Sequence, residues 1–492
     1  MGISPLSADG MDFDQSSAEF VHWFTAADGT RLSHKVQLRD LRRTNAGRAA
    51  VAIQDIAEDE ELFAVPRSMV LTTTTSNIPP SVLQSLEDTG AWPPLIVTII
   101  YEFLRKDKSP WHPYFKVLPT TFDTLMFWNS AELAELQASA VVHKIGREQA
   151  EELWRQTIIP VMLAHPGLFP VPGATPSERT AELIKLAHMA GSLIMAYAFD
   201  IDRDDPKPDD GDASSEDDFE EDDEDEPFKG MVPFADMLNA DADRNNARLF
   251  QETDYLVMKA TKPISAGEQI FNDYGPLPRS DLVRMYGYTT DNYAQFDVVE
   301  FSHHLLLEVA GKKHNKENKA WLDREQQLDE IGLIDDGYSI PRPDPNVRRL
   351  EDTLSGQLHM LLRALCVHEN DAKAVKKPKD AVTIEEAALL QAVLTKKLSE
   401  YGTSHEADQA ILDALHSNST TSTVPAACDP RRYSMALQVR MGEKEVLRQL
   451  IILCQSHIKQ KSEELAVGQS KRKYDSNTEI LSEKAAKKEK HR

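Results

Sequence analysis

The fold is decided by residues 231–288, which read MVPFADMLNADADRNNARLFQETDYLVMKATKPISAGEQIFNDYGPLPRSDLVRMYGY. Two short motifs stand out in this segment, ADMLNA at 235–240 and IFNDYG at 270–275. Asn and Asp clusters are by themselves typical of turns, because their side chains bond to nearby backbone groups. The residues between the motifs predict a β-hairpin, with strands at 255–260 and 268–271 around a Ser-Ala-Gly turn. Together the two motifs indicate a small β unit that carries a site.

Upstream of this segment the β-type pattern continues and is then interrupted by helices. Residues 20–75 read as short strands with an Asp28-Gly29 turn. Residues 78–200 instead place apolar side chains at three- and four-residue spacing. We expect one long helix from Ser130 onward and another over residues 178–199. The pattern predicts an α+β fold, in which a β-rich domain at 20–300 contains a helical insertion at about 78–200.

The two ends of the chain differ in character from this domain. Residues 301–460 contain three segments with a 3.6-residue apolar repeat, which predicts a separate all-α domain. We expect residues 1–19 to be a disordered N-terminus. We expect residues 461–492 to be a flexible basic tail, because the last 22 residues have eight basic and four acidic side chains. Such a tail is either a nuclear-import signal or a solubilising end.

The net charge of −25 is concentrated in one tract. Residues 202–226 hold 16 acidic and two basic side chains, which accounts for more than half of the total. Such a run repels itself and buries little apolar surface, so we expect a disordered loop. It is either a solvated insertion or an electrostatic funnel for a basic partner. Nucleic acid is disfavoured as a direct ligand, because phosphate binding needs clustered Lys and Arg.

Composition and motifs exclude several classes of protein. Cys366, Cys428 and Cys454 lie far apart in the sequence, so we expect neither a disulfide scaffold nor a metal site. We expect the protein to occupy a reducing compartment. No apolar run approaches the roughly 18 residues of a membrane span, and no secretory signal is visible. The motifs of phosphate-binding loops, dinucleotide folds, zincins and serine hydrolases are absent as well. We therefore expect a soluble intracellular protein whose chemistry lies in the two motifs.

In their order and setting, these motifs resemble those of the SET-domain protein methyltransferases, specifically the Rubisco large-subunit methyltransferase type. The likeness is carried by four stretches and by the C-terminal segment RRYSMALQVRMGEKEVLRQL, which is similar to the helical substrate-binding domain of that subfamily. The four stretches are residues 46–49, 192–199, 236–239 and 272–288. The resemblance implies a knotted β-rich SET domain, S-adenosyl-L-methionine on one side, a lysine channel on the other, no metal, and a monomer.

The resemblance also implies roles for individual residues. Tyr274 would be the catalytic tyrosine at the methyl-transfer point, and Phe199 and Tyr288 would form the substrate channel. The residues implied to contact the cofactor are Gly47, Arg48, Ala49, Tyr197, Asp236, Asn239, Ala240, Tyr274 and Tyr286. The chain departs from many relatives at Ala49, where they have Gly, at Ala240, where they have His, and at Tyr197, where they have Arg. These departures weaken the expected grip on the cofactor.

A tyrosine-lined channel suits this chemistry. Methyl transfer from a sulfonium to an amine is an in-line displacement, promoted mainly by alignment of the two groups. The amine must be neutral, although the pKa of free lysine is about 10.4. Burial beside a cationic sulfonium lowers that pKa, because desolvation and like charge both disfavour the ammonium form. Phenol hydroxyls can orient the amine, and aromatic rings accommodate the cationic product.

We therefore expect a protein-lysine N-methyltransferase located in the nucleus, with the cytoplasm as second choice. The likeness to the ribosomal lysine methyltransferases of this subfamily implies a basic partner, a large-subunit ribosomal protein, and no contact with membranes. Two alternatives stay open. One is a non-catalytic SET-type binding module, which Ala49 and Ala240 favour. The other is a methyltransferase acting on a histone, a regulatory protein or a histidine.

Overall fold

The computed structural model describes residues 13–44, 46–202, 228–311, 319–347, 349–367, 381–417 and 424–489. The chain divides into two compact units, Met1–Asn129 with His143–Tyr293, and Ser130–Val142 with Ala294–Arg492. The division after Tyr293 lies close to the domain boundary predicted near residue 300. Residues 130–142 join the second unit, which the sequence did not indicate. The predicted acidic loop, apart from Asp202, lies outside the described residues.

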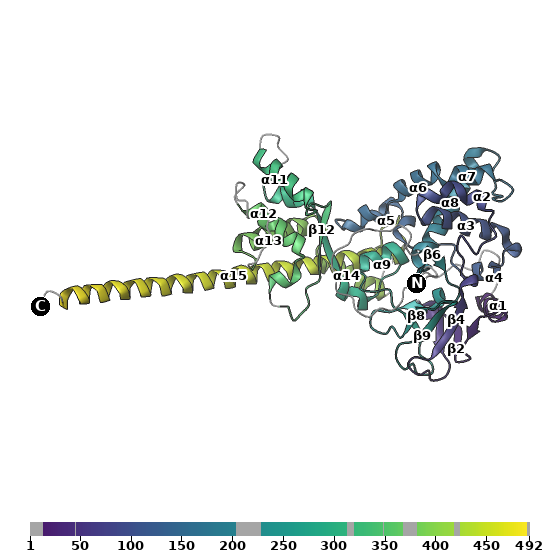
Figure 1. Cartoon of the computed structure of the whole chain (residues 1–492), viewed down its shortest axis with the longest axis horizontal. Coiled ribbons are helices and arrows are strands. Elements are labelled where there is room, and N and C mark those ends of the chain that lie inside the picture. Colours follow the sequence, from purple (N-terminus) through teal and green to yellow (C-terminus); the bar gives the residue numbers. More distant parts are fainter. Residues whose placement is uncertain are drawn as a thin grey trace. The chain divides into compact units, whose positions relative to one another are not determined.

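The first unit is built around a four-stranded antiparallel sheet with strand order β1-β4-β9-β8 (Figure 1). Three further pairs, β2-β3, β5-β6 and β7-β10, complete its β structure. The central strands β4 and β9 are almost continuously buried, as expected of strands covered on both faces. The strands are β1 Arg31–Leu32, β2 Val36–Leu41, β3 Gly47–Ala52, β4 Glu61–Pro66, β5 Ala198–Ile201, β6 Phe228–Met231, β7 Asn239–Ala240, β8 Ala247–Gln251, β9 Tyr255–Ala260 and β10 Phe271–Asn272.

The hairpin predicted between the two motifs is only half right. Strand β9 coincides with the predicted strand at 255–260, but its partners are β4 and β8. Residues 268–271 do not return to β9. They turn toward β3 instead, because the Ala52 amide donates to the Glu268 carbonyl at 2.9 Å and the Ile270 amide donates to the Ala50 carbonyl at 2.8 Å. This path delivers the second motif to the site.

The predicted disorder of residues 1–19 was wrong for residues 13–19, and residues 1–12 lie outside the described residues. Residues 13–26, expected partly as disorder and partly as strand, form helix α1, Phe13–Ala26. Phe20 and Phe24 are one helical turn apart and fully buried, and both rings pack on the ring of Phe234. The apolar spacing in this segment is therefore helical. Because α1 is anchored in the core, it can cover part of the site.

The insertion between β4 and β5 is helical, as predicted (Figure 1). Helix α8 matches the helix predicted at 178–199, and a capping box of Thr175 and Glu178 begins it. The long helix expected from Ser130 is broken, because Gln137 and Gly146 adopt left-handed backbone with φ of 54° and 66°. The helices of this unit are α2 Pro80–Leu83, α3 Trp92–Arg105, α4 His112–Phe115, α6 Arg147–Gln156, α7 Ile158–Ala164, α8 Pro176–Tyr197 and α9 Arg279–Tyr286, with short 3-10 turns η5 Leu125–Phe127 and η7 Ala235–Met237.

The second unit is mostly helical, but the all-α prediction needs a correction. Strands β11, Val298–Ser302, and β12, Gly337–Pro341, form an antiparallel pair. Helix α15 also continues to Glu489 through the segment expected as a flexible tail (Figure 1). The helices are α5 Ser130–Ala134, α10 His303–Val309, α11 Lys319–Glu330, α12 Gly356–Cys366, α13 Ile384–Ser399, α14 His405–His416 and α15 Pro430–Glu489.

Buried charges attach residues 130–142 to α15. Arg432 donates to Glu132 at 3.0 Å, and the fully buried Arg440 donates to Glu135 at 2.9 Å and to Asp408 at 2.8 Å. Charges taken out of water must be paired, so each partner depends on the others. Ser139 adds a 2.6 Å hydrogen bond to the buried carboxylate of Glu443. These contacts explain why a short segment leaves the first unit.

Candidate active site

The two motif segments lie side by side. Strands β7 and β10 pair in parallel, with Phe271 opposite Asn239 and Asn272 opposite Ala240. The Asn239 amide nitrogen donates to the Ala46 carbonyl at 2.9 Å and to the Gln269 side-chain oxygen at 2.6 Å. Asn239 therefore joins the start of β3 to the start of the second motif, and it fixes three segments that are distant in sequence.

A small cavity of about 70 Å³ opens next to this junction. Gly47 enters β3 with φ of 63°, a left-handed conformation that glycine adopts without strain. The cavity brings together five of the predicted cofactor-binding residues, which are Gly47, Arg48, Tyr197, Asp236 and Asn239. These five residues thus converge on one concave site, although they come from three separate segments of the chain.

Arg48 is held in place by helix α1 and by the segment after α4. Its guanidinium donates to the Ser17 hydroxyl at 2.9 Å, to the Ser16 hydroxyl at 3.1 Å and to the Val117 carbonyl at 2.8 Å. Burial lowers the pKa of Arg48 to about 10, which leaves it a cation at neutral pH. Phe13 lies 4.1 Å from this guanidinium and lines the same cavity. The sequence did not reveal this contribution of α1.

A second cavity, of about 230 Å³, shares Tyr197 and Asp236 with the first. Phe199, Tyr274 and Tyr286 line it as well. The rings of Tyr274 and Tyr286 stack with centroids 4.2 Å apart and planes 11° apart. Burial raises the pKa of Tyr274 far above its ordinary value and that of Tyr286 to about 12, so both phenols are neutral at physiological pH. They can hydrogen-bond but cannot act as phenolate bases.

A tight turn places Tyr286 at this cavity. Helix α9 ends at Tyr286, and Gly287 follows with φ of 71°. A Cβ atom at Gly287 would lie 2.7 Å from the backbone carbon of Asp123, so only glycine fits there. Tyr288 then turns back and meets the Tyr286 ring edge-on, with centroids 6.4 Å apart. Tyr288 is buried behind Tyr286 and lines neither cavity.

The remaining predicted residues lie one layer behind the cavities. Ala49 is fully buried inside β3, and its φ is not positive, so the methyl group that replaces a common glycine causes no backbone strain. Ala240 pairs with Asn272 through β7 and β10. Eight of the eleven predicted site residues therefore line the two cavities, and Ala49, Ala240 and Tyr288 do not.

Comparison with known proteins assigns this geometry to a family. Residues 47–275 match the SET domain family, and residues 315–447 match the Rubisco LSMT substrate-binding family. The chain therefore carries a SET domain followed by a Rubisco LSMT substrate-binding domain. This confirms the predicted recognition, the α+β fold class and the enzyme class.

Named relatives and solved structures agree with this family. Ribosomal lysine N-methyltransferase 4 of Saccharomyces cerevisiae is 35% identical over 322 residues, which is 64% of this chain and 63% of that protein, under two thirds of its length. N-lysine methyltransferase SETD6 of Mus musculus is 29% identical over 482 residues, 91% of this chain and 92% of that protein. The crystal structure of the SET domain of LSMT bound to lysine and AdoHcy has a TM-score of 0.63 at 19% identity, covering 92% of this chain and 93% of that chain. A Rubisco LSMT structure bound to AdoMet has a TM-score of 0.61 at 20% identity, covering 90% and 92%. These two structures establish the fold.

The residues of this SET-type site fit a cationic cofactor. Asp236 stands in the wall shared by the two cavities, and its Oδ1 is buried without a hydrogen-bond partner among the described residues. Its Oδ2 accepts a hydrogen bond from the fully buried Tyr114 of α4. No local pattern in the sequence indicated Tyr114, because 122 residues separate it from Asp236. A carboxylate with a free oxygen and surrounding aromatic rings favour a positively charged ligand.

The described residues contain no group of three or more His, Cys, Asp or Glu side chains arranged to hold a metal ion. Among the helices of the described ranges, none combines the length and the apolar character that crossing a bilayer requires.

Asp236 makes the stability of the SET unit depend on pH. Burial raises its pKa from 3.8 to about 7, so the folded state binds more protons than the unfolded state between these values. The free energy of unfolding should therefore fall as pH rises from 4 to 7, by up to about 4 kcal/mol. Asp236→Asn should reduce this decline in denaturant titrations of the cofactor-free protein at pH 4.5, 6 and 8, and the part due to the buried Glu443, whose pKa is also raised to about 7, should remain. The matched control Asp200→Asn changes an exposed carboxyl and should preserve it. Parallel curves for wild type and Asp236→Asn would contradict the assignment.

Proposed function

We propose that this chain methylates a lysine side chain of a large-subunit ribosomal protein, with S-adenosyl-L-methionine as the methyl donor. The observation that carries the proposal is the stacked pair of Tyr274 and Tyr286 in a cavity bounded by the β7 and β10 segments. A narrow aromatic cavity strips water from an amine and holds it in one direction, which is what this displacement requires.

Each part of the site would have a separate task. Gly47, Arg48, Asn239 and Tyr197 would hold the cofactor in the smaller cavity, which Phe13 closes from α1. When bound there, S-adenosyl-L-methionine supplies a methyl carbon attached to a positively charged sulfur. The Tyr274 hydroxyl would orient the lysine amine, and Phe199 and Tyr286 would exclude water around it. The amine loses its proton before it enters, because desolvation disfavours the ammonium form.

A ribosomal substrate is supported by two separate facts. The yeast relative is named a ribosomal lysine N-methyltransferase. Residues 202–226 carry 16 acidic side chains, and this charge suits a Lys-rich partner.

We propose that the enzyme is located in the nucleus, because basic residues, including Lys471, Arg472 and Lys473, lie near its C-terminus.

The experiment that tests this function uses labelled S-adenosyl-L-methionine. Purified wild-type protein is incubated with a lysate of cells that lack it, and the labelled residue is mapped by mass spectrometry. We expect one lysine in a large-subunit ribosomal protein. A labelled histidine, or a lysine of a histone or regulatory protein, would replace the substrate assignment. An absence of label together with an absence of cofactor binding in calorimetry would favour a non-catalytic binding module.

The acidic tract should accelerate encounter with such a substrate. Replacing the acidic residues of 202–226 by Ser and Gln keeps the chain length but removes the charge. We expect kcat/KM for the labelled basic protein to fall several-fold at low salt and to be unchanged at about 0.5 M salt, where charges are screened within a few ångströms. An equally long variant with shuffled acidic positions is the control and should behave as wild type. A loss that is independent of salt would show that the tract does not steer substrate.

A further inference from the structure

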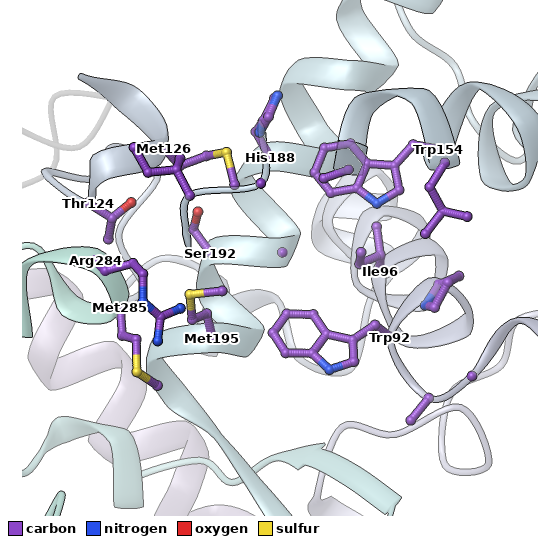
Figure 2. A pocket seen from close by; sticks show the side chains of 18 of the residues that line it. Trp92, Ile96, Thr124, Met126, Trp154, His188, Ser192, Met195, Arg284 and Met285 are labelled. Atoms are coloured by element: carbon purple, nitrogen blue, oxygen red, sulfur yellow. The ribbon is translucent and has the colours of Figure 1, made fainter. Parts of the chain in front are cut away.

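A third cavity, larger than the two cavities of the candidate active site and called the large cavity below, lies mainly in the helical insertion and was not predicted from the sequence. It has a volume of about 450 Å³, in the range of cavities that bind small molecules or groups of side chains. Figure 2 shows Trp92 and Trp154 on one side and Met126, Met195 and Met285 on the other. Methionine and aromatic linings adapt to apolar groups of varied shape.

This cavity adjoins the proposed methyl-transfer site. Met195 of α8 lines both this cavity and the cavity that contains Tyr274. Met285 of α9 lines the large cavity, and the next residue, Tyr286, lines the tyrosine cavity. The two cavities therefore share a wall made of α8 and α9. A bound peptide whose lysine enters beside Tyr286 would carry neighbouring residues past the large cavity.

The lining of the large cavity selects the class of occupant. None of its described lining residues is acidic, so it offers no partner to a basic side chain. Its outer edge includes Leu153, which is 47% exposed and extends the apolar surface toward solvent. Its polar lining residues include Thr124, His188, Ser192 and Arg284. His188 Nε2 bonds Glu151 at 2.9 Å, and His188 Nδ1 and the Thr124 hydroxyl have no partner among the described residues. The rest of the lining is mostly apolar, so an apolar group matches most of it.

We propose that the large cavity anchors a bulky apolar side chain of the substrate, a few residues from the target lysine. This inference rests on the proposed function. On α8, Gly191 and Ser192 line the large cavity, and Tyr197 lines the cavity that contains Tyr274. Five or six residues of helix span about 8 Å at 1.5 Å per residue. An extended peptide covers that distance in about two or three residues. Specificity would thus combine a lysine with an apolar residue at short spacing.

Gly191 provides a way to fill the cavity without touching the site. An added Cβ atom there would meet Trp154 at 3.6 Å and Ile96 at 3.9 Å, which is ordinary contact. Gly191→Ala should therefore fold normally, and it also favours the helix. Gly191→Leu extends further into the cavity and should exclude a substrate side chain. Thermal unfolding and calorimetry with S-adenosyl-L-methionine verify that both variants are folded and bind cofactor as wild type does.

The test uses the protein labelled in the lysate experiment and a version whose bulky apolar residues within four positions of the labelled lysine are Ala. For wild type and Gly191→Ala, we expect the KM for the natural substrate to be at least about tenfold lower than the KM for the Ala-substituted substrate. A tenfold change corresponds to a loss of about 1.4 kcal/mol of binding. Gly191→Leu should raise the KM for the natural substrate to the value found for the Ala-substituted substrate. It should leave the KM for the Ala-substituted substrate unchanged.

Three results would overturn the proposal that the large cavity binds an apolar side chain of the substrate. They are a labelled lysine with no bulky apolar neighbour within four residues, an equal KM of wild type for both substrates, and an equal loss for Gly191→Leu on both substrates. The last result would indicate that the cavity serves another occupant or the fold itself. Failure of wild type to label any protein would instead reject the proposed function, so the two failures are distinguishable.

Discussion

Replacing Tyr274 by Phe should lower kcat for methyl transfer by about 100-fold or more, because a displacement that depends on alignment is sensitive to small errors in position. The substitution removes one hydroxyl and keeps the ring, so the stack with Tyr286 at 4.2 Å should persist. Folding and cofactor affinity should therefore change little. Labelled methyl incorporation, thermal unfolding and calorimetry measure the three quantities separately.

The matched control for this variant is Tyr255→Phe. Tyr255 lies in β9 and stacks under Arg31 at 4.6 Å, and it lines neither cavity of the site. It should retain wild-type activity. Unchanged turnover by Tyr274→Phe would remove the orienting role of the hydroxyl, whereas a parallel loss of stability would assign Tyr274 a structural role.

Replacing Asn239 by Ala should affect both stability and cofactor binding. The change removes the donor that serves the Ala46 carbonyl and the Gln269 side chain. A buried acceptor left without a donor costs about 1–3 kcal/mol, and because both acceptors here are half-buried we expect a loss of about 1–3 kcal/mol in total in the free energy of unfolding. Ala46 leads directly into Gly47 in the cofactor cavity, and we expect at least about tenfold weaker cofactor binding as this strand start shifts.

Asn245→Ala is the control for Asn239→Ala. The Asn245 amide bonds only a local carbonyl, that of Ala242 at 3.3 Å. Its replacement should cost well under 1 kcal/mol in urea unfolding and should leave calorimetric affinity for the cofactor unchanged. Similar values for the two variants would show that Asn239 does not connect the two motif segments.

The sequence was sufficient where local pattern and motif agreed. Helix α8 has a Thr175 capping box, an N-terminal Pro and an apolar repeat, so its position followed from residues close together in the chain. The site residues followed from resemblance, and most of them line the two cavities. In contrast, Tyr114 and the seryl partners of Arg48 reach the site from remote segments, and no local pattern marks such contacts.

The errors have identifiable physical causes. Residues 20–24 were predicted as a strand because Phe, Val and Trp are frequent in strands. Phe20 and Phe24 are both fully buried, and only a helix places two residues at this spacing on the same face toward the core. The long helix from Ser130 had a continuous apolar repeat, yet tertiary contacts favoured left-handed turns at Gln137 and Gly146. The hairpin predicted over residues 255–271 does not form, because β4 and β8 already pair with the two edges of β9.

The attachment of residues 130–142 to α15 has a consequence during protein synthesis. Glu132 and its partner Arg432 are 300 residues apart, and Glu135 and Arg440 are 305 apart. A ribosome that adds 5–20 residues each second needs about 15–60 s to bridge that gap. During this interval Glu132 and Glu135 of the nascent chain would lack their partners from α15. A C-terminal fragment without residues 130–142 would likewise lack the two carboxylates that pair with Arg432 and Arg440. Synthesis of the first turns of α15, which carry Arg432 and Arg440, is thus the step that allows these charges to pair.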